Sequence, residues 1–307
     1  MKWQGRQRSS NVEDRRSTTG GLNRGFGVNP FGRGSGPSFR LPGGRTGGGG
    51  IGGIIVIVVI LGVIWFATGQ NPLDMLTGNS SSLNPSSSSS SQPLPEVGQD
   101  ETADFVGVVL KETETLWSKK FAEAGERYDP PKVVLFSEAI NSACGDADAR
   151  SGPFYCPTDQ KVYIDLTFYD QLRQQFGAPG DFAQAYVLAH EVGHHVQNLM
   201  GVLPEFNARR AQLSQDEANA YSVRVELQAD CYAGVWANDA KRQNLLESGD
   251  AEEAINAANA IGDDTLTRGT VQPRNFTHGT SAQRMEWFRR GMQSGDPAQC
   301  DTFSGDV

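Results

Sequence analysis

Apolar residues recur at helical spacing over most of the chain after residue 100, so the sequence predicts a mainly helical body. The first predicted element is an amphipathic helix over residues 104–127, with apolar positions at Phe105, Val108, Val109, Trp117 and Phe121. Further helices are predicted over residues 167–176, 182–200, 214–240, 251–261 and 281–291. Gly201 and Gly291 stand where two of these helices are expected to end.

Two shorter segments have the character of strands. Lys132–Phe136 follows a pair of prolines, and Lys161–Leu166 alternates between polar and apolar residues. A loop rich in Gly, Asp and Pro is predicted between them, over residues 144–157. Because the strands come first and the helices then dominate, the predicted fold class is α+β, mostly helical with a small sheet.

A separate apolar run without a charge covers residues 51–67. Extended to Gly69, it is long enough to cross a hydrocarbon core of roughly 30 Å as a helix, with Trp65 and Phe66 near the far interface. A buried strand, a core helix or a cleaved signal peptide are the alternatives. The long polar leader and the lack of a clean cleavage site favour a transmembrane signal anchor over residues 51–69.

The segments on either side of this run are polar. Residues 1–50 are rich in Gly, Arg and Ser and are predicted to be a disordered basic tail. They hold nine basic and two acidic residues, a net charge of +7, which we expect to keep the tail cytoplasmic and the body exported, at an inner membrane. Residues 70–99 form a Ser- and Pro-rich linker, and the body covers residues 100–307.

The charge of the body bears on its partners. The whole chain has a net charge of −9, so the residues after the tail carry −16. Such an acidic body argues against nucleic acid as a partner. The arginine- and glycine-rich tail leaves RNA binding as a weaker alternative. Against it, we expect deletion of the tail to leave the activity of the body intact and to disturb only the insertion topology.

Four cysteines lie in the body, at Cys144, Cys156, Cys231 and Cys300. An even number in an exported body favours disulfides. Cys144 and Cys156 close a short loop and are the expected first pair, which leaves Cys231 with Cys300. Free buried thiols are the alternative.

The motif His190-Glu191-Val192-Gly193-His194 lies inside the predicted helix over residues 182–200. Two histidines four residues apart project from one helix face, which suits a tetrahedral zinc ion. Glu191, beside the first histidine, can then act on a zinc-activated water. Three of the four histidines in the chain fall in this segment, which hydrogen-bonded core histidines alone would not explain.

A catalytic zinc ion usually has three protein ligands. The sequence excludes the metzincin pattern, since Gln197 and Met200 occupy the positions of its glycine and third histidine. Glu226 in the next long helix can supply the third ligand. Asp230, one turn later on the same face, can accept a hydrogen bond from a zinc-bound histidine.

The acidic pair Asp216 and Glu217 offers a rival for the third ligand. These residues stand at the polar start of the same helix, where carboxylates commonly serve as caps. The flanks of Glu226 are apolar instead, and a carboxylate buried there needs a partner. Glu226 is therefore the expected ligand.

The combination of His190-Glu191-x-x-His194 with Glu226-x-x-x-Asp230 resembles the gluzincin metallopeptidases. The longer motifs resemble one largely uncharacterised bacterial family of neutral zinc metallopeptidases; they are Ala189-His-Glu-Val-Gly-His-His-Val-Gln197, Glu226-Leu-Gln-Ala-Asp-Cys-Tyr-Ala-Gly234 and Thr277-His-Gly-Thr-Ser-Ala-Gln-Arg284. The resemblance covers the body and the anchor. It implies a zincin-like fold that holds Zn²⁺ through His190, His194 and Glu226, with Glu191 as general base.

The resemblance also implies a protein group that stabilises the oxyanion of the reaction. His278 and Arg284 are the candidates, with a surface histidine and a structural ion pair as the alternative roles. His195 is rotated by about 100° from His194 around the helix, so it is not an expected ligand. Tyr163–Leu166 is the strand expected to lie at the sheet edge and pair with a peptide substrate.

The predicted function is a membrane-anchored zinc metallopeptidase that acts on a peptide or protein substrate. The first alternative is a zinc-binding scaffold at the membrane without catalysis, and intact Glu191 argues against it. An intramembrane protease is disfavoured because the motif lies far from the apolar run. The sequence predicts neither the substrate nor the oligomeric state.

Overall fold

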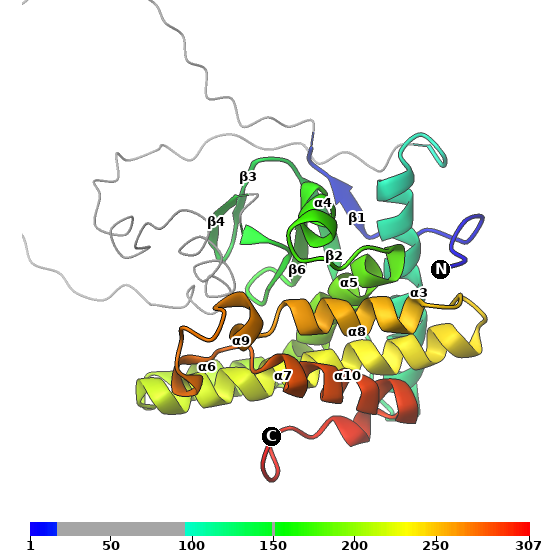
Figure 1. Ribbon diagram of the computed structural model, residues 1–307. Coiled ribbons are helices and arrows are strands. Elements are labelled where there is room, and N and C mark those ends of the chain that lie inside the picture. Colours follow the sequence, from blue (N-terminus) through cyan, green and yellow to red (C-terminus); the bar gives the residue numbers. More distant parts are fainter. Residues whose placement is uncertain (17–95, 149–150) are drawn as a thin grey trace, which may run out of the picture.

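A computed structural model describes residues 1–16, 96–148 and 151–307 and shows a small sheet beside a larger group of helices (Figure 1). The strands are β1 (Val12–Asp14), β2 (Lys132–Phe136), β3 (Ala139–Ser142), β4 (Gly145–Asp148), β5 (Phe154–Cys156) and β6 (Lys161–Asp165). The helices are α3 (Glu101–Glu123), α4 (Thr167–Gln174), α5 (Asp181–Leu199), α6 (Val202–Arg210), α7 (Gln215–Arg242), α8 (Asp250–Ala260), α9 (Asp263–Leu266) and α10 (Ser281–Ser294). Two short 3-10 helices, Pro273–Asn275 and Pro297–Cys300, complete the order. The mixed helical and strand content agrees with the predicted α+β class.

The main sheet has the strand order β1-β2-β6-β5. β1, β2 and β6 are parallel, and β5 runs antiparallel to β6. One face of the sheet packs on the helices through residues such as Val133 and Ile164. The other face, with Val134, Phe154 and Tyr163, packs against the β3–β4 hairpin. The sheet is therefore covered on both faces, and β5 forms one of its edges.

Helix α5 lies in the middle of the helical layer and contacts α3, α7 and α8. Helices α7 and α10 run side by side along the lower part of the molecule (Figure 1). Their close approach depends on two glycines, because a Cβ at Gly234 would lie 2.1 Å from the Phe288 carbonyl oxygen and one at Gly291 would lie 2.0 Å from that of Cys231.

Capping residues explain where several helices begin. Ser214 and Glu217 form a capping box at the start of α7, and Thr280 and Gln283 form one at the start of α10. The sequence predicts that α10 ends at Gly291, but this glycine lies inside the helix. Gly295, with a φ of 61°, ends the helix instead. The sequence signal of Gly291 reflects helix packing rather than helix termination.

Both predicted disulfides are present. Cys144 joins Cys156, which ties the β3–β4 hairpin to the edge strand β5, and Cys231 joins Cys300, which ties α7 to the C-terminal segment.

The first sixteen residues correct one prediction, since the sequence predicts a disordered tail there. Met1, Trp3 and Val12 are buried, and β1 pairs with β2. Ion pairs hold the segment in addition: Arg6 to Glu112, Arg8 to Asp104 and Arg16 to Asp100. The low aliphatic content suggested disorder, but these arginines find their partners in the acidic body.

The predicted membrane-spanning helix is also corrected. Among residues 1–16, 96–148 and 151–307, no helix is both long enough and apolar enough to cross a membrane. Residues 51–69, where the prediction falls, lie outside the described residues, as does nearly all of the predicted linker. The prediction used the length, the hydropathy and the flanking residues of the segment, and none of these shows how the segment folds. The single-pass inner-membrane location that depended on it is withdrawn.

Two local predictions need a further correction. The expected loop over residues 144–157 contains β4 and β5, so Tyr163 and its neighbours in β6 are paired on both sides rather than lying at an edge. Pro153 and Pro157 flank β5 and made this segment look like a loop, although proline is tolerated beside edge strands. Helix α6 was not predicted either.

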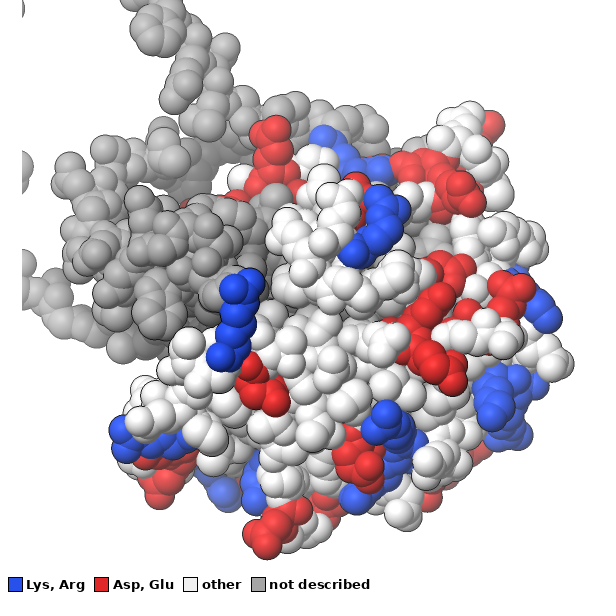
Figure 2. All heavy atoms as spheres, viewed as in Figure 1, with Lys and Arg blue, Asp and Glu red and all other residues white. Residues whose placement is uncertain are grey.

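On the face shown in Figure 2, acidic and basic side chains of the described residues are interspersed. No continuous basic surface is visible among them on this face.

Candidate active site

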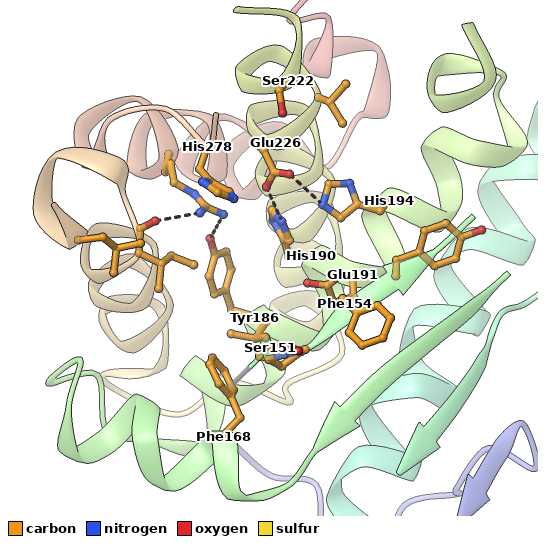
Figure 3. A pocket seen from close by; sticks show the side chains of 18 of the residues that line it. Ser151, Phe154, Phe168, Tyr186, His190, Glu191, His194, Ser222, Glu226 and His278 are labelled. Carbon is orange, nitrogen blue, oxygen red and sulfur yellow. Dashed lines mark hydrogen bonds and ion pairs between the residues drawn. The ribbon is translucent and has the colours of Figure 1, made fainter. Parts of the chain in front are cut away.

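Helices α5 and α7 bring the three predicted metal ligands together (Figure 3). His190 Nε2 lies 3.2 Å from one carboxylate oxygen of Glu226, and His194 Nε2 lies 3.5 Å from the other. Gly193 allows the helices to approach, since a Cβ there would lie 3.0 Å from the Ala229 carbonyl oxygen. Residues far apart in sequence thus form one cluster of two imidazoles and a carboxylate.

Hydrogen bonds on the far side of each imidazole fix the orientation of the rings. His190 Nδ1 donates to Asp230 at 2.8 Å, the contact that the sequence predicts for this carboxylate. His194 Nδ1 donates to the side-chain oxygen of Gln197 at 2.8 Å, because the amide nitrogen of Gln197 is occupied by the Val225 carbonyl oxygen. Both Nε2 atoms therefore face Glu226.

Asp230 is the centre of a buried network. It accepts hydrogen bonds from the Tyr186 hydroxyl at 2.6 Å and from Arg284 Nε at 2.8 Å, in addition to the bond from His190. Arg284 also donates to the Ile261 carbonyl oxygen. The structure thus places Arg284 in an ion pair behind the imidazoles, which is the alternative role that the sequence left open for it.

The charges of this cluster shift several pKa values. Burial disfavours protonated His190, but Asp230 and Glu226 outweigh it and raise the pKa of His190 to about 9. Burial disfavours ionised Asp230, yet Arg284 and His190 lower the pKa of Asp230 to about 2. Burial acts on Glu226 in the same way, and the histidines hold the pKa of Glu226 well below its usual range. Both carboxylates are therefore ionised at neutral pH.

Glu191 lies in the same pocket and is 8% exposed. Burial raises the pKa of Glu191, against the influence of His194 and His190 and of a backbone hydrogen bond from Tyr155. A carboxylate with a raised pKa is a better proton acceptor near neutral pH. Its hydrogen bond to Tyr155 also connects it to the edge strand β5.

The pocket around this cluster is mainly apolar. Its walls come from β5, α4, α6, the C-terminal end of α8 and α9. Phe154, Phe168, Leu203, Ile261 and Leu266 are among the lining residues. Ser222 and Asn207 add polar groups on the side of α7 and α6. Such a pocket suits an apolar side chain next to a polar reacting group.

His278 lines the same pocket and is 5% exposed. Its Nδ1 lies 2.9 Å from Asp263, whose other carboxylate oxygen accepts bonds from the backbone N–H groups of Thr277 and His278. Burial would lower the pKa of His278, but Asp263 and Glu226 raise it. The structure therefore does not support a surface role for this histidine, and Nε2 is left for a pocket ligand.

His195 is directed away from the cluster. Its Nε2 donates to the Asp129 carbonyl oxygen at 2.7 Å, so Nδ1 accepts from the Tyr155 hydroxyl at 3.0 Å. Burial lowers the pKa of His195 to about 4, so the ring is neutral at pH 7. It links β5 to α5, as expected for a residue that is not a ligand.

The donor set fits zinc. His190, His194 and Glu226 offer ligand atoms that lie within 4.8 Å of one another, and two imidazoles with one carboxylate are a known catalytic zinc set. The hydrogen-bonded Nδ1 atoms orient the rings as metal-binding histidines require. The rivals Asp216 and Glu217 lie at the exposed start of α7, and Glu217 serves as a cap.

Sequence reasoning missed Tyr186, Gln197 and Asp263 as members of this site. Tyr186 lies one turn before His190, so its spacing could have suggested a contact with Asp230. Asp263 belongs to another segment, and no spacing connects it with His278.

Comparisons with known proteins agree with this geometry. A family model described as "Putative neutral zinc metallopeptidase" matches residues 1–303. The uncharacterised protein YpfJ of Escherichia coli is 46% identical over the whole of both chains. The uncharacterised protein Rv2575 of Mycobacterium tuberculosis is 47% identical over 58% of this chain and 64% of its own length. No solved structure matches the chain.

Proposed function

The chain belongs to the neutral zinc metallopeptidase family, and from that membership and the geometry of its site we propose that it hydrolyses peptide bonds with the help of Zn²⁺. His190, His194 and Glu226 would hold the ion. The observation that carries the proposal is the convergence of these three side chains beside a buried Glu191 in one pocket.

When bound, zinc would supply a Lewis acid that lowers the pKa of a water toward ~7 and polarises a carbonyl group. Glu191 would accept the proton of the attacking water and return it to the leaving amine. Its buried position and raised pKa support this role. Asp230 and Gln197 would keep the two imidazoles in the required orientation.

His278 would donate a hydrogen bond to the oxyanion that forms on the scissile carbonyl. Asp263 orients the ring through Nδ1 and favours its protonated form. A donor that is fixed before the reaction stabilises the developing charge without reorganisation. Arg284 is engaged by Asp230 and is proposed as a positioning residue rather than as a second donor.

The substrate would lie along β5. This strand pairs with β6 on one side and stands at the end of the sheet order, so its other side can pair with an extended peptide. β5 has three residues and Pro153 and Pro157 flank it, so only a short length of peptide backbone would be held.

The substitution Glu191→Gln tests the proposal. We expect hydrolysis of a peptide library by the full chain to fall by roughly 10²- to 10⁴-fold, while the zinc content per chain is unchanged. Glu252→Gln, at an exposed glutamate of α8, is the matched control and should leave the rate unchanged.

An unchanged rate in Glu191→Gln would reject the catalytic role of this residue. Bound zinc without any peptide cleavage by the unaltered chain would instead favour a zinc-binding module without catalysis.

A further inference from the structure

The two disulfides of the body differ in their exposure to solvent. Cys231 and Cys300 are both buried, at 0% and 1% exposure. Cys144 is half-buried and lines the pocket, whereas its partner Cys156 is fully buried. Thiol–disulfide exchange requires a thiolate to reach one of the two sulfurs. The Cys144–Cys156 bond offers a residue that a thiolate can reach, while both residues of the other bond are shielded.

The Cys144–Cys156 bond links the β3–β4 hairpin covalently to the edge strand β5. The strands β3 and β4 pair with each other in a two-stranded sheet of their own. Ser142 is buried, but the other residues of these two strands are exposed or half-buried. The hairpin packs on the main sheet through Ile140, Cys144 and Ala147, which are all partly buried. The disulfide is therefore the covalent part of a small interface.

This interface lies behind one wall of the pocket that contains the zinc-site residues. Pro153, Phe154 and Pro157 line the pocket on the side of β5. Phe154 stacks on Tyr163, with 4.9 Å between the ring centroids, and both rings belong to the apolar cluster that the hairpin covers. The position of the hairpin therefore bears on the pocket wall and on the strand proposed to pair with the substrate.

We propose that the Cys144–Cys156 bond is a thiol-exchange site, and that its reduction by a dithiol loosens β5 and weakens peptide binding. Exposed disulfides are the ones that reductants cleave most readily, whereas buried ones resist. The effect on peptide binding rests on the proposed function, but the exchange and the loosening of β5 do not.

The exchange begins when one thiolate of the dithiol attacks Cys144 Sγ. The S–S bond breaks, and its electron pair leaves with Cys156 Sγ, which takes up a proton. The second thiolate of the dithiol then attacks the first, so that Cys144 leaves as a thiolate and is protonated in turn. The Thr158 hydroxyl lies 3.7 Å from Cys144 Sγ and can donate a hydrogen bond to that thiolate. The dithiol has then passed two electrons and two protons to the cysteine pair and has become a disulfide.

The test treats the full chain with dithiothreitol under native conditions, blocks free thiols with iodoacetamide and identifies the alkylated cysteines by mass spectrometry. We expect alkylation at Cys144 and Cys156, while Cys231 and Cys300 stay joined. The reduced chain should hydrolyse peptides with a kcat/KM lower by roughly 10-fold or more, mainly through KM, because a loosened strand has to be ordered on binding. Oxidised glutathione should restore the original value.

The double variant Cys144→Ser/Cys156→Ser is the matched control, since it lacks the bond without any reductant. It should share the raised KM of the reduced chain, and dithiothreitol should not change its kcat/KM further. This comparison separates cleavage of the disulfide from removal of zinc by the reductant, because thiolates are also zinc ligands.

Alkylation of Cys231 and Cys300 at the same dithiothreitol concentration as Cys144 would overturn the proposal. An unchanged KM in the reduced, active chain would overturn it as well.

Amide hydrogen exchange over residues 154–156 gives a readout that does not depend on catalysis. We expect exchange in this strand to become faster when the disulfide is reduced. If the unaltered chain cleaves no peptide, faster exchange together with selective alkylation would still support the control of β5 by the disulfide. Unchanged exchange would overturn it, whether or not the chain is a peptidase.

Discussion

At the scale of single residues, the site depends on hydrogen bonds to the Nδ1 atoms of its histidines, which orient the imidazole rings. Asp230 and Gln197 each occupy one nitrogen of an imidazole and leave the other nitrogen toward Glu226. Asp263 does the same for His278. The sequence predicts the first of these supports, because Asp230 lies one turn from Glu226.

Replacing Asp230 should weaken zinc binding. In Asp230→Asn the amide cannot match the charge of His190 and Arg284, so we expect the Kd for zinc to rise by roughly 10- to 100-fold, measured by competition with a chelator. Asp216→Asn, at an exposed aspartate of the same helix, is the control and should bind zinc like the unaltered chain. Equal affinities in the two variants would show that Asp230 does not support the metal ligands.

His278 should affect the rate and leave the metal in place. We expect His278→Ala to lower kcat for a peptide by roughly 10²- to 10³-fold, with an unchanged zinc content and a smaller change in KM. His278→Gln keeps a hydrogen-bond donor and should recover part of the rate. Loss of zinc in His278→Ala would contradict the proposed role, because His278 is not a ligand in the cluster described above.

At the scale of secondary-structure elements, close helix packing sets the geometry of the site. Helix α7 carries Glu226 and Asp230, and it is held between α5 and α10. Gly193 faces α7 from α5, while Gly291 faces it from α10. Neither glycine has a side chain, so the two helix backbones can approach closely at each of these positions.

Gly291→Ala should therefore destabilise the protein. The new Cβ would lie 2.0 Å from the Cys231 carbonyl oxygen, so α10 would have to move away from α7. We expect the free energy of unfolding to fall by about 1–3 kcal/mol or more, measured by urea denaturation. Gln293→Ala, at an exposed position of α10, should have little effect. Similar stabilities of the two variants would show that the helices adapt easily.

The prediction of elements succeeded where the signal is local. The helices α3, α5, α7, α8 and α10 follow from apolar spacing, β2 follows from a short apolar run, and β6 follows from the alternation of polar and apolar residues. The hairpin β3–β4 and the edge strand β5 were missed. Gly, Asp and Pro in this region favour loops when each segment is judged by its own residues, without the strands that pair with it. Pairing with β6 and the disulfide of Cys156 stabilise β5 from outside its own sequence.

Part of the arrangement of the site could be predicted for a similar reason, while the metal-binding and catalytic roles of its residues stay predictions. His190, His194, Glu226 and Asp230 each obey a helical spacing, which sequence shows directly. The pairing of His278 with Asp263 and of Arg284 with Asp230 depends on how distant segments pack. No spacing within the chain encodes these contacts.

At the scale of the whole molecule, the first residues are joined to distant parts of the fold. Glu13 in β1 lies 3.1 Å from the amines of both Lys132 in β2 and Lys161 in β6, and 2.6 Å from Arg15. Burial would raise the pKa of Glu13, but Arg15, Lys132 and Lys161 outweigh it and lower it from 4.5 to about 2. The ionised form is therefore favoured by folding.

This shift predicts a pH dependence of stability. A carboxyl group with a depressed pKa in the folded protein stabilises it fully above the unfolded pKa of 4.5, and this contribution is lost as the pH falls toward about 2. The unaltered chain should thus be more stable than Glu13→Gln at pH 7, and the difference in Tm should shrink below pH 4.5. A difference that stays constant between pH 7 and pH 3 would contradict the assigned ion pairs.

The ion pair between Arg16 and Asp100 joins two described segments that lie far apart in the sequence. Arg16 Nη1 lies 2.5 Å from Asp100, which also caps α3 through the Ala103 N–H. One carboxylate therefore both starts the first helix of the body and holds the residues that follow β1. A change at Asp100 would act on both segments at once, so its effect on stability could not be read as the loss of a helix cap alone.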